Sequence, residues 1–205
     1  MNDILIQAIQ ARHTINLFDP SHTLSDDDIT SLVKLATTAP SSFNLQNWRF
    51  IAVRNPESKA RLRRIAWDQA KITEAAVTFI VCGQLADYRT LAERLQPVVD
   101  AGIMPPTMVP GWVGAAKSLY DGKPRQQRDE AVRTATFGAS TLIQAAHAFG
   151  LGAGPMIGFD ADAVSQEFGL RPDEVPVMLL AVGKALPDNW PQKPRRPIND
   201  VLTLA

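Results

Sequence analysis

Apolar residues recur along the chain with two spacings, one typical of helices and one of buried strands. A spacing of three or four residues predicts helices over about 2–11, 25–38, 86–98 and 126–149, with a further helix that begins near Pro56. Short and nearly continuous apolar runs predict strands at 48–53, 77–82 and 174–182. Strands scattered among helices in this way are typical of an α+β or an α/β fold.

Individual residues set the ends of these elements. Ser25 precedes three aspartates, so we expect it to cap a helix whose first turn favours negative charge. Pro40 ends that helix, and Gly150 ends the long helix over 126–149. The run 174–182 is almost entirely apolar, which predicts a strand that is buried on both faces.

Residues 101–124 are rich in glycine and proline and fit neither spacing. Apolar residues nevertheless recur through this segment, which also carries Trp112 and Tyr120. We therefore interpret it as an excursion or lid on a single domain of residues 1–205, and not as a linker. Trp112 and Tyr120 are expected either to stack on an aromatic substrate or to fill the core of the excursion.

Composition narrows the classes of protein. The 205 residues are 45% hydrophobic and 20% charged, which is ordinary for a soluble globular domain. Lys and Arg together number 21, as do Asp and Glu, so no basic excess points to a nucleic-acid partner. The N-terminal residues show neither a basic start nor a long apolar run, so we expect no secretory signal. No apolar run reaches about 18 residues, so we expect no membrane-spanning helix.

Cys82 is the sole cysteine, so no disulfide forms within the chain. This fits a reducing compartment, and we expect a cytoplasmic protein. Its apolar neighbours predict a buried core thiol. One cysteine and three scattered histidines, His13, His22 and His147, do not predict a metal site. His147 is expected to pack in a core or an interface.

Three polar clusters are candidates for ligand binding. Residues 12–16 combine a cation with hydroxyl and amide groups, which suits an anion, although a solvated helix end explains them as well. Residues 39–48 offer amides and hydroxyls that can read a heteroaromatic edge, or form an ordinary turn. Residues 193–196 hold three cations that can clamp a phosphate, or form a solvated basic tail.

The glycine-rich run 150–158 is not a dinucleotide-binding fingerprint. Its glycines follow a helix instead of joining a strand to one, and their spacing is not G-x-G-x-x-G. We interpret it as a path where backbone approaches a flat ligand closely. The chain also lacks the G-x-S-x-G, H-E-x-x-H and P-loop motifs of hydrolases, metalloproteases and nucleotide-binding enzymes.

Taken in order, these motifs resemble the nitroreductase family of FMN-dependent oxidoreductases. The string Ala-Pro-Ser-Ser-x-Asn-x-Gln at 39–46, about 25 residues after Arg12-His13-Thr14, is the most specific part. Trp48–Val53, Gly150–Asp160 and Lys193-x-Arg195 follow in the family's order. The resemblance implies an α+β fold, with a mixed sheet flanked by helices, in an intertwined homodimer with two FMN sites at its interface. Residues 101–124 lie where the family varies most.

The resemblance also implies roles for individual residues. Arg12, His13 and Thr14 would hold the phosphate and ribityl chain of FMN, and Lys193 and Arg195 would complete the phosphate clamp. The partner subunit would contribute a second set of cofactor contacts: Pro40, Ser41, Ser42 and Asn44, with Gln46 at the end of the same motif.

A third set would surround the flavin ring. Lys71 would face its N1 and O2 atoms and stabilise the negative charge of the reduced ring, with Gln69 as a weaker candidate. The remaining ring contacts implied are Asn16, Pro155, Met156, Ile157 and Gly158.

The implied activity is a ping-pong hydride transfer from NAD(P)H, through flavin N5, to a nitroaromatic, quinone or enone. No side chain is then required as nucleophile or base, which agrees with the missing motifs. Three residues differ from those that the family often carries: Asn47 replaces a proline, Asn16 a basic residue and Ile157 an acidic residue. These differences affect the expected substrate range and flavin potential. Alternatives are an FMN enzyme for a small aldehyde, enal or halogenated aromatic, a low-turnover flavin-binding protein, and a plain α/β interaction module.

Overall fold

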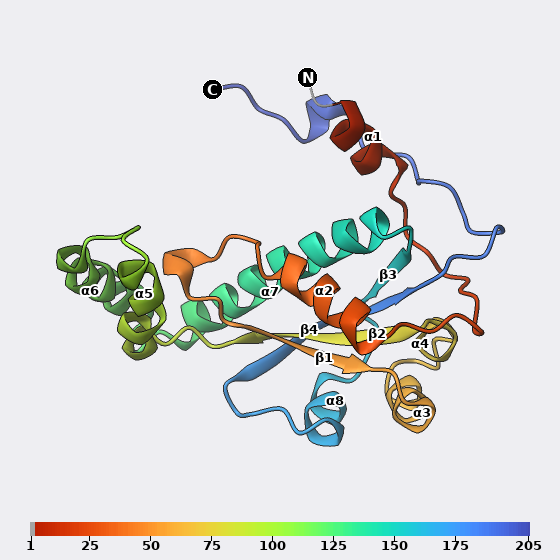
Figure 1. Cartoon of the computed structure of the whole chain (residues 1–205), viewed down its shortest axis with the longest axis horizontal. Coiled ribbons are helices and arrows are strands. Elements are labelled where there is room, and N and C mark those ends of the chain that lie inside the picture. Colours follow the sequence, from red (N-terminus) through yellow and green to blue (C-terminus); the bar gives the residue numbers. More distant parts are fainter. Residues whose placement is uncertain (1–2) are drawn as a thin grey trace.

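The computed structural model describes residues 3–205, and one four-stranded sheet organises them (Figure 1). The strands are β1 (Trp48–Val53), β2 (Val77–Gln84), β3 (Gly152–Met156) and β4 (Glu174–Gly183). The helices are α1 (Asp3–Ala11), α2 (Asp26–Ala36), α3 (Pro56–Arg64), α4 (Lys71–Glu74), α5 (Leu91–Asp100), α6 (Val109–Tyr120), α7 (Pro124–Ala148) and α8 (Ala161–Glu167). Four short 3₁₀ turns are η1 (Ser42–Asn44), η2 (Tyr88–Thr90), η3 (Pro106–Met108) and η4 (Ile198–Asp200).

The strands lie in the order β1-β2-β4-β3, and each neighbouring pair is antiparallel. Helices α2 and α7 cover one face, while α3 and α8 lie on the other (Figure 1). The α+β prediction is confirmed. A mixed sheet was expected. In the described residues, the one parallel pairing is an isolated bridge between Thr14 and Ala153.

Alternating side chains of the central strands fill the two faces. On β2, Val77, Phe79 and Val81 pack in a cluster with residues of α2 and α7, whereas Ile80 and Cys82 join the cluster on the opposite face. Cys82 is fully buried as predicted, and burial together with nearby Glu174 raises the pKa of its thiol to about 12. β2 is buried on both faces along nearly its whole length, and β4, for which this was predicted, is fully buried from Leu179 onward and half-buried at 175–178.

The long helix α7 lies unusually close to the sheet. Small residues, including Ala131 and Ala135, form its buried face. A Cβ atom on Gly83 of β2 would lie 2.0 Å from the carbonyl oxygen of Ala131, so a glycine is required at that contact. Backbone of β2 therefore touches backbone of α7, which fixes the helix firmly across the sheet.

Several local predictions are confirmed. Ser25 caps α2 in a reciprocal capping box with Asp28, in which each side chain accepts from the other residue's backbone N–H. The helix predicted over 126–149 is α7, which begins at Pro124 because proline is favoured in a first turn. Helix α1 covers the prediction for 2–11, whose first residue lies outside the described residues.

Other predictions need correction. The glycine-rich run forms β3, an edge strand that was not predicted because glycines and a proline weaken the strand signal. The segment 101–124 contains a regular helix, α6, which was not predicted. The expectation that Trp112 and Tyr120 fill the core of this segment is confirmed, because Tyr120 is buried with Met104 and Ala116 and Trp112 packs against them. The predicted helix 86–98 is divided into η2 and α5. Short helices α4 and α8 were not predicted.

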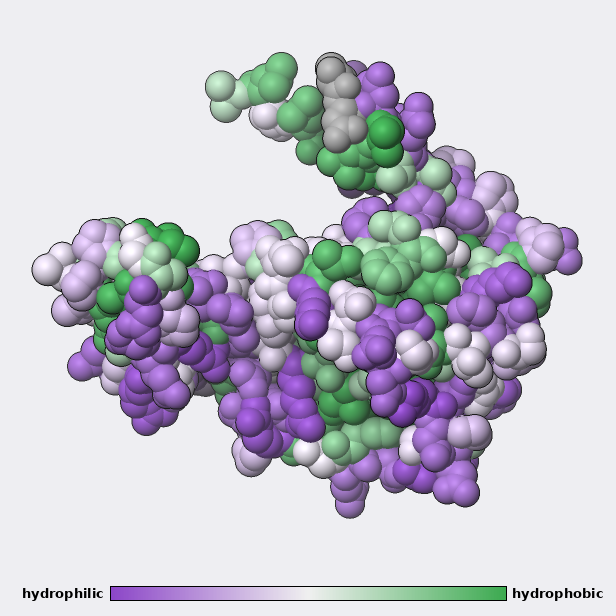
Figure 2. Space-filling model, in the orientation of Figure 1, coloured by the Kyte–Doolittle hydropathy of each residue, from purple (hydrophilic) through white to green (hydrophobic). Residues whose placement is uncertain are grey.

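Both ends of the chain leave the body of the molecule together. Helix α1 and the C-terminal tail project from the same side (Figure 1), and apolar residues are visible on this arm (Figure 2). Helix α1 buries no residue, and its Ile4 is 81% exposed. Among the described residues, no helix is long and apolar enough to cross a membrane.

We predict that Gly83→Ala destabilises the fold, because the added methyl group overlaps the α7 backbone. Overpacking of this kind costs about 1–3 kcal/mol. Gly114→Ala is the matched control, since nothing lies within 4 Å of a Cβ atom there and alanine favours the α6 helix. Urea denaturation measures both; equal free energies of unfolding for the two variants would contradict the close contact.

Candidate functional site

The segment that follows α1 lies along edge strand β3. The backbone N–H of Ile15 donates to the carbonyl oxygen of Ala153 at 3.0 Å, and Thr14 bridges to the same residue. A Cβ atom on Gly154 would lie 2.3 Å from the carbonyl oxygen of Ile15, so the absence of a side chain there permits the contact. The glycine-rich run is therefore in backbone contact with residues 14–15 of the same chain. The approach of this run to a flat ligand stays a prediction, and Gly154 is occupied by the contact with Ile15.

The C-terminal tail is fastened to this segment by Asn189. Its Oδ1 accepts from the backbone N–H groups of Asn16 and Leu17 at 2.7 and 3.0 Å, and its Nδ2 donates to the Leu17 carbonyl at 2.8 Å. Further along, Gln192 Nε2 donates to the carbonyl oxygen of Arg12 at 3.3 Å. The tail therefore crosses over residues 12–17.

This crossing joins two of the predicted clusters. Thr14 and Asn16 line one small cavity with Lys193 and Arg195. A neighbouring cavity of about 350 Å³ lies between Asn16, Lys193 and the tail, and also includes Asp188. Of the predicted cluster at 12–16, Thr14 and Asn16 thus share a cavity with Lys193 and Arg195.

Lys71 brings a further cation to the same place from the start of α4. Its Nζ donates to Oδ1 of Asn16 at 3.0 Å. Burial and the nearby charge of Lys193 both lower the pKa of Lys71. Within residues 3–205, no ion pair involves Arg12, Lys71, Lys193 or Arg195. Lys71 is half-buried, whereas Lys193 and Arg195 are exposed. Cations held close together are stabilised by a bound anion, so this donor set fits a phosphate group.

Residues 155–158 border the Lys71 side of the site. Gln69 Nε2 donates to the carbonyl oxygen of Gly158 at 2.9 Å, which ties the turn before α4 to the end of β3. Trp67 packs against Gly158 and is nevertheless 79% exposed. Ile157 is 83% exposed beside it, while Met156 is buried. The two predicted ring segments therefore lie side by side.

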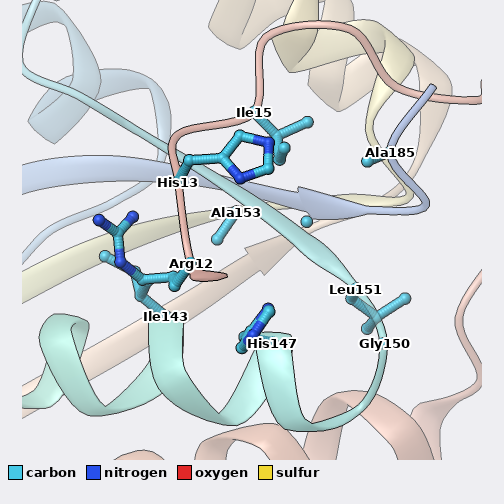
Figure 3. Close-up of a pocket in the computed structure, with 10 residues that line it drawn as sticks. Arg12, His13, Ile15, Ile143, His147, Gly150, Leu151, Ala153 and Ala185 are labelled. Carbon is cyan, nitrogen blue, oxygen red and sulfur yellow. The ribbon is translucent and has the colours of Figure 1, made fainter. Parts of the chain in front are cut away.

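Arg12 and His13 diverge in direction. They line a cavity of about 220 Å³ together with His147 from α7 (Figure 3). Arg12 projects to one side of the loop and His13 to the other, and His13 Nδ1 lies 3.1 Å from the Ala11 carbonyl. The side chains of Arg12 and His13 thus do not line the cavity that Lys193 and Arg195 share. His147 is half-buried at this cavity and not in a core.

The loop at 39–47 lies at the opposite end of the sheet, beside the lobe of α5 and α6 (Figure 1). Phe43, Asn44 and Gln46 have positive φ angles of 53°, 56° and 47°, an uncommon conformation for residues other than glycine. The Ser41 hydroxyl accepts from the Gln46 backbone N–H at 3.0 Å, and Gln46 Nε2 donates to Asn44 Oδ1 at 3.3 Å. One chain does not bring Pro40, Ser41, Ser42, Asn44 and Gln46 to the cationic cluster.

Two further side chains hold this loop: Arg94, which the sequence did not single out, and Asn47, which was noted only as a departure from the family pattern. Arg94 of α5 donates through Nη1 to the carbonyl oxygen of Leu45, and burial lowers the pKa of Arg94. Asn47 is buried and donates to the Gln84 carbonyl at 2.6 Å, so it ties the loop to the end of β2.

Asn189 and Trp190 were also missed at the tail. Trp190 lines both tail cavities, and the Lys193 ammonium lies 5.2 Å from its ring centroid. The only local signal was a polar pair and a tryptophan after Pro187. An asparagine that serves backbone 172 and 173 residues away leaves no pattern in the sequence around it.

The family model named Nitroreductase matches residues 9–184. The chain belongs to the nitroreductase family. The family predicted from the motifs is therefore confirmed, and it covers the sheet, both flanking layers and the lobe. The unmatched tail after residue 184 nevertheless carries Asn189, Lys193 and Arg195.

Nitroreductase relatives cover nearly the whole chain. It is 34% identical to protein DrgA of Synechocystis, over 88% of this chain and 84% of that protein. It is 26% identical to the CLA biosynthesis enone reductase of Lactiplantibacillus plantarum, over 90% of this chain and 87% of that enzyme.

Solved structures agree with this fold. A nitroreductase candidate of Bacillus subtilis, ydfN, gives a TM-score of 0.93 at 26% identity over 100% of both chains. A candidate nitroreductase of Exiguobacterium sibiricum, solved in complex with FMN, gives 0.89 at 29% identity, covering 98% of this chain and 96% of that one.

We predict that Arg94→Ala loosens the loop at 39–47, because the buried Leu45 carbonyl loses its donor. An unsatisfied buried group costs about 1–3 kcal/mol. Arg89→Ala is the control, since Arg89 is exposed in the same lobe and pairs with Asp87. Hydrogen exchange should accelerate at 41–47 in the Arg94 variant alone. Unchanged exchange there would contradict the role of Arg94.

Proposed function

We propose that this nitroreductase binds FMN and transfers electrons from NAD(P)H to a small electrophilic acceptor. Family membership and relatives named as candidate NAD(P)H nitroreductases make the chain an oxidoreductase. The observation that carries the cofactor is the group formed by Lys71, Lys193 and Arg195, in which none of the three cations has an ion pair within residues 3–205. FMN supplies a phosphate for such a group and a ring that accepts hydride at N5.

The residues of the proposed site divide by chemistry. Thr14, Lys193 and Arg195 offer a hydroxyl and two cations to the phosphate, with Arg12 at the edge of the cluster. Lys71, held by Asn16, offers a positive charge to the ring edge where reduction places negative charge. Gln69 and residues 155–158 would bound the ring on the same side. In this proposal the chain positions the flavin and stabilises the charge of its reduced ring, and no side chain acts as acid, base or nucleophile.

The proposed site requires a second copy of the chain. Residues 40–46 lie too far from the cationic cluster of their own chain to complete it (Figure 1). The apolar residues that project on α1 and on the tail offer a surface for mutual wrapping. We therefore propose an intertwined homodimer in which each copy offers Pro40, Ser41, Ser42, Asn44 and Gln46 to the partner's cofactor.

The acceptor is proposed to be a nitroaromatic, a quinone or an enone. Relatives named for nitro compounds support the first class, and the enone reductase of L. plantarum supports the third. The hydride would pass in two half-reactions at one open face: NAD(P)H would give up its hydride and leave as NAD(P)+ before the acceptor enters. The small aldehydes, enals and halogenated aromatics stay as alternatives, as does a flavin-binding protein with little turnover.

The phosphate assignment predicts a difference between two neighbouring arginines. Arg195→Ala should weaken FMN binding about 10- to 100-fold, because a charge-assisted bond to phosphate is worth about 1.5–3 kcal/mol. Binding of riboflavin, which lacks the phosphate, should change little. Arg196→Ala is the control, since Arg196 is absent from the cavity lining and contacts Asp200. Fluorescence titration of apoprotein with both flavins measures this.

Two results would refute the proposal. Wild-type protein that takes up no FMN, and stays colourless when purified with it, is not a flavoprotein. Wild-type protein that binds FMN but accelerates no acceptor beyond free FMN is the low-turnover flavin protein of the alternative.

If each cofactor site is formed by both subunits, two defective variants should complement each other in a heterodimer. Asn44→Gly removes the side chain while keeping a residue that tolerates its positive φ. A heterodimer of Asn44→Gly with Arg195→Ala contains one intact site, so it should retain about half of wild-type activity because a two-fold dimer has two equivalent sites. Each homodimer should be impaired at both sites. A heterodimer as impaired as its parents would mean that each site lies within one chain.

A further inference from the structure

The lobe formed by α5, η3 and α6 contains a cavity that the cofactor site does not use. Its volume is about 260 Å³, and it lies between Leu95 and Val98 of α5 on one side and Met108 and Trp112 on the other. Apolar residues gather along this edge of the lobe (Figure 2). No charged side chain lines the cavity among the described residues, and Asn44 is the one polar residue of its lining.

Asn44 connects this cavity to the proposed cofactor site. The same residue lines the cavity and belongs to the loop proposed to reach the flavin of the partner subunit. The connection is rigid, because the ring of Phe43 packs edge-on against Trp112 with centroids 6.0 Å apart and planes at 72°. Arg94 of α5 holds the next carbonyl of the loop. The cavity wall and the flavin loop are therefore one packed unit.

The chemistry of the lining selects the kind of ligand. An apolar cavity that opens to the surface gains free energy from burying hydrocarbon and offers nothing to a charge or a phosphate. Two methionines, Met104 and Met108, adapt their shape to chains of different form. The volume is that of a small-molecule pocket and does not accommodate a helix or strand of another protein.

We propose that this lobe cavity binds the apolar substituent of the electron acceptor while the reducible head lies at the flavin beside Asn44. This inference rests on the proposed function, and it deepens that function by naming the substrate class: quinones or enones that carry an alkyl tail. A charged or unsubstituted acceptor gains nothing from the cavity.

A series of 2-alkyl-1,4-benzoquinones tests the idea on the FMN-loaded dimer, with methyl, propyl and hexyl tails on one reacting head. In the wild type, kcat/KM should rise about three- to fourfold per buried methylene. Met108→Glu, which places a carboxylate at the cavity, should abolish this rise, so that kcat/KM for the hexyl compound is no higher than that for the methyl compound in the same variant. Leu119→Glu is the control: it lies on α6 outside the cavity, and its 45% exposure matches the 44% of Met108.

A binding measurement without turnover accompanies the kinetics. Calorimetric titration with 4-hexylphenol and 4-methylphenol, which accept no electrons from the flavin, should show tighter binding of the hexyl compound. That preference should be lost in Met108→Glu and kept in Leu119→Glu.

The outcomes separate the two levels of the argument. A wild-type enzyme that reduces the methyl quinone but shows no dependence on tail length overturns the cavity assignment and leaves the proposed function intact. Equal loss of the tail preference in both variants also overturns it, because the tail would then bind elsewhere. A dimer that carries no FMN and reduces no quinone refutes the proposed function, and this inference with it.

Discussion

Contact between the backbone at Ile15 and the edge strand β3 is the constraint on which the candidate site depends. The Ile15 carbonyl lies where a Cβ atom of Gly154 would be, so the two backbones meet without a side chain between them. That contact fixes residues 14–17, and Asn189 then binds their backbone and directs the tail across them. Two basic segments from opposite ends of the chain thereby meet. Hydrogen bonds to the backbone of residues 15–17 hold the two segments together, and these bonds set the positions of the charged side chains.

The charges themselves oppose the fold. Burial, together with the nearby charge of Lys193, lowers the pKa of Lys71 and so disfavours its protonated form. Natural proteins tolerate such strain mainly where a ligand relieves it. Arg49, by contrast, forms an ion pair with buried Glu174 and is structural. Lys71 has no carboxylate partner in the described residues, which supports the proposal that an anion binds beside it.

The lobe is joined to the rest of the chain at the loop that carries Asn44. Arg94 and the Phe43–Trp112 contact make loop and lobe move as one body. A change in the length or packing of residues 101–124 would therefore reach the loop directly. If the loop supplies the proposed cofactor contacts, residues 101–124 shape the space next to them.

The local pattern alone determined much of this protein. Apolar runs placed β1, β2 and β4, the capping box at Ser25 placed α2, and the ordered motifs identified the family. These features depend on neighbours within a few residues, which the sequence displays directly. Strand β3 escaped because its glycines serve a contact with Ile15 and weaken the strand pattern. Only the tertiary structure decided which residues share a cavity: Asn189 joins residues 16 and 189, Arg94 holds residue 45, and the loop at 39–47 is kept away from the tail. Such contacts join positions far apart in the chain, and their energies depend on packing that no local spacing encodes.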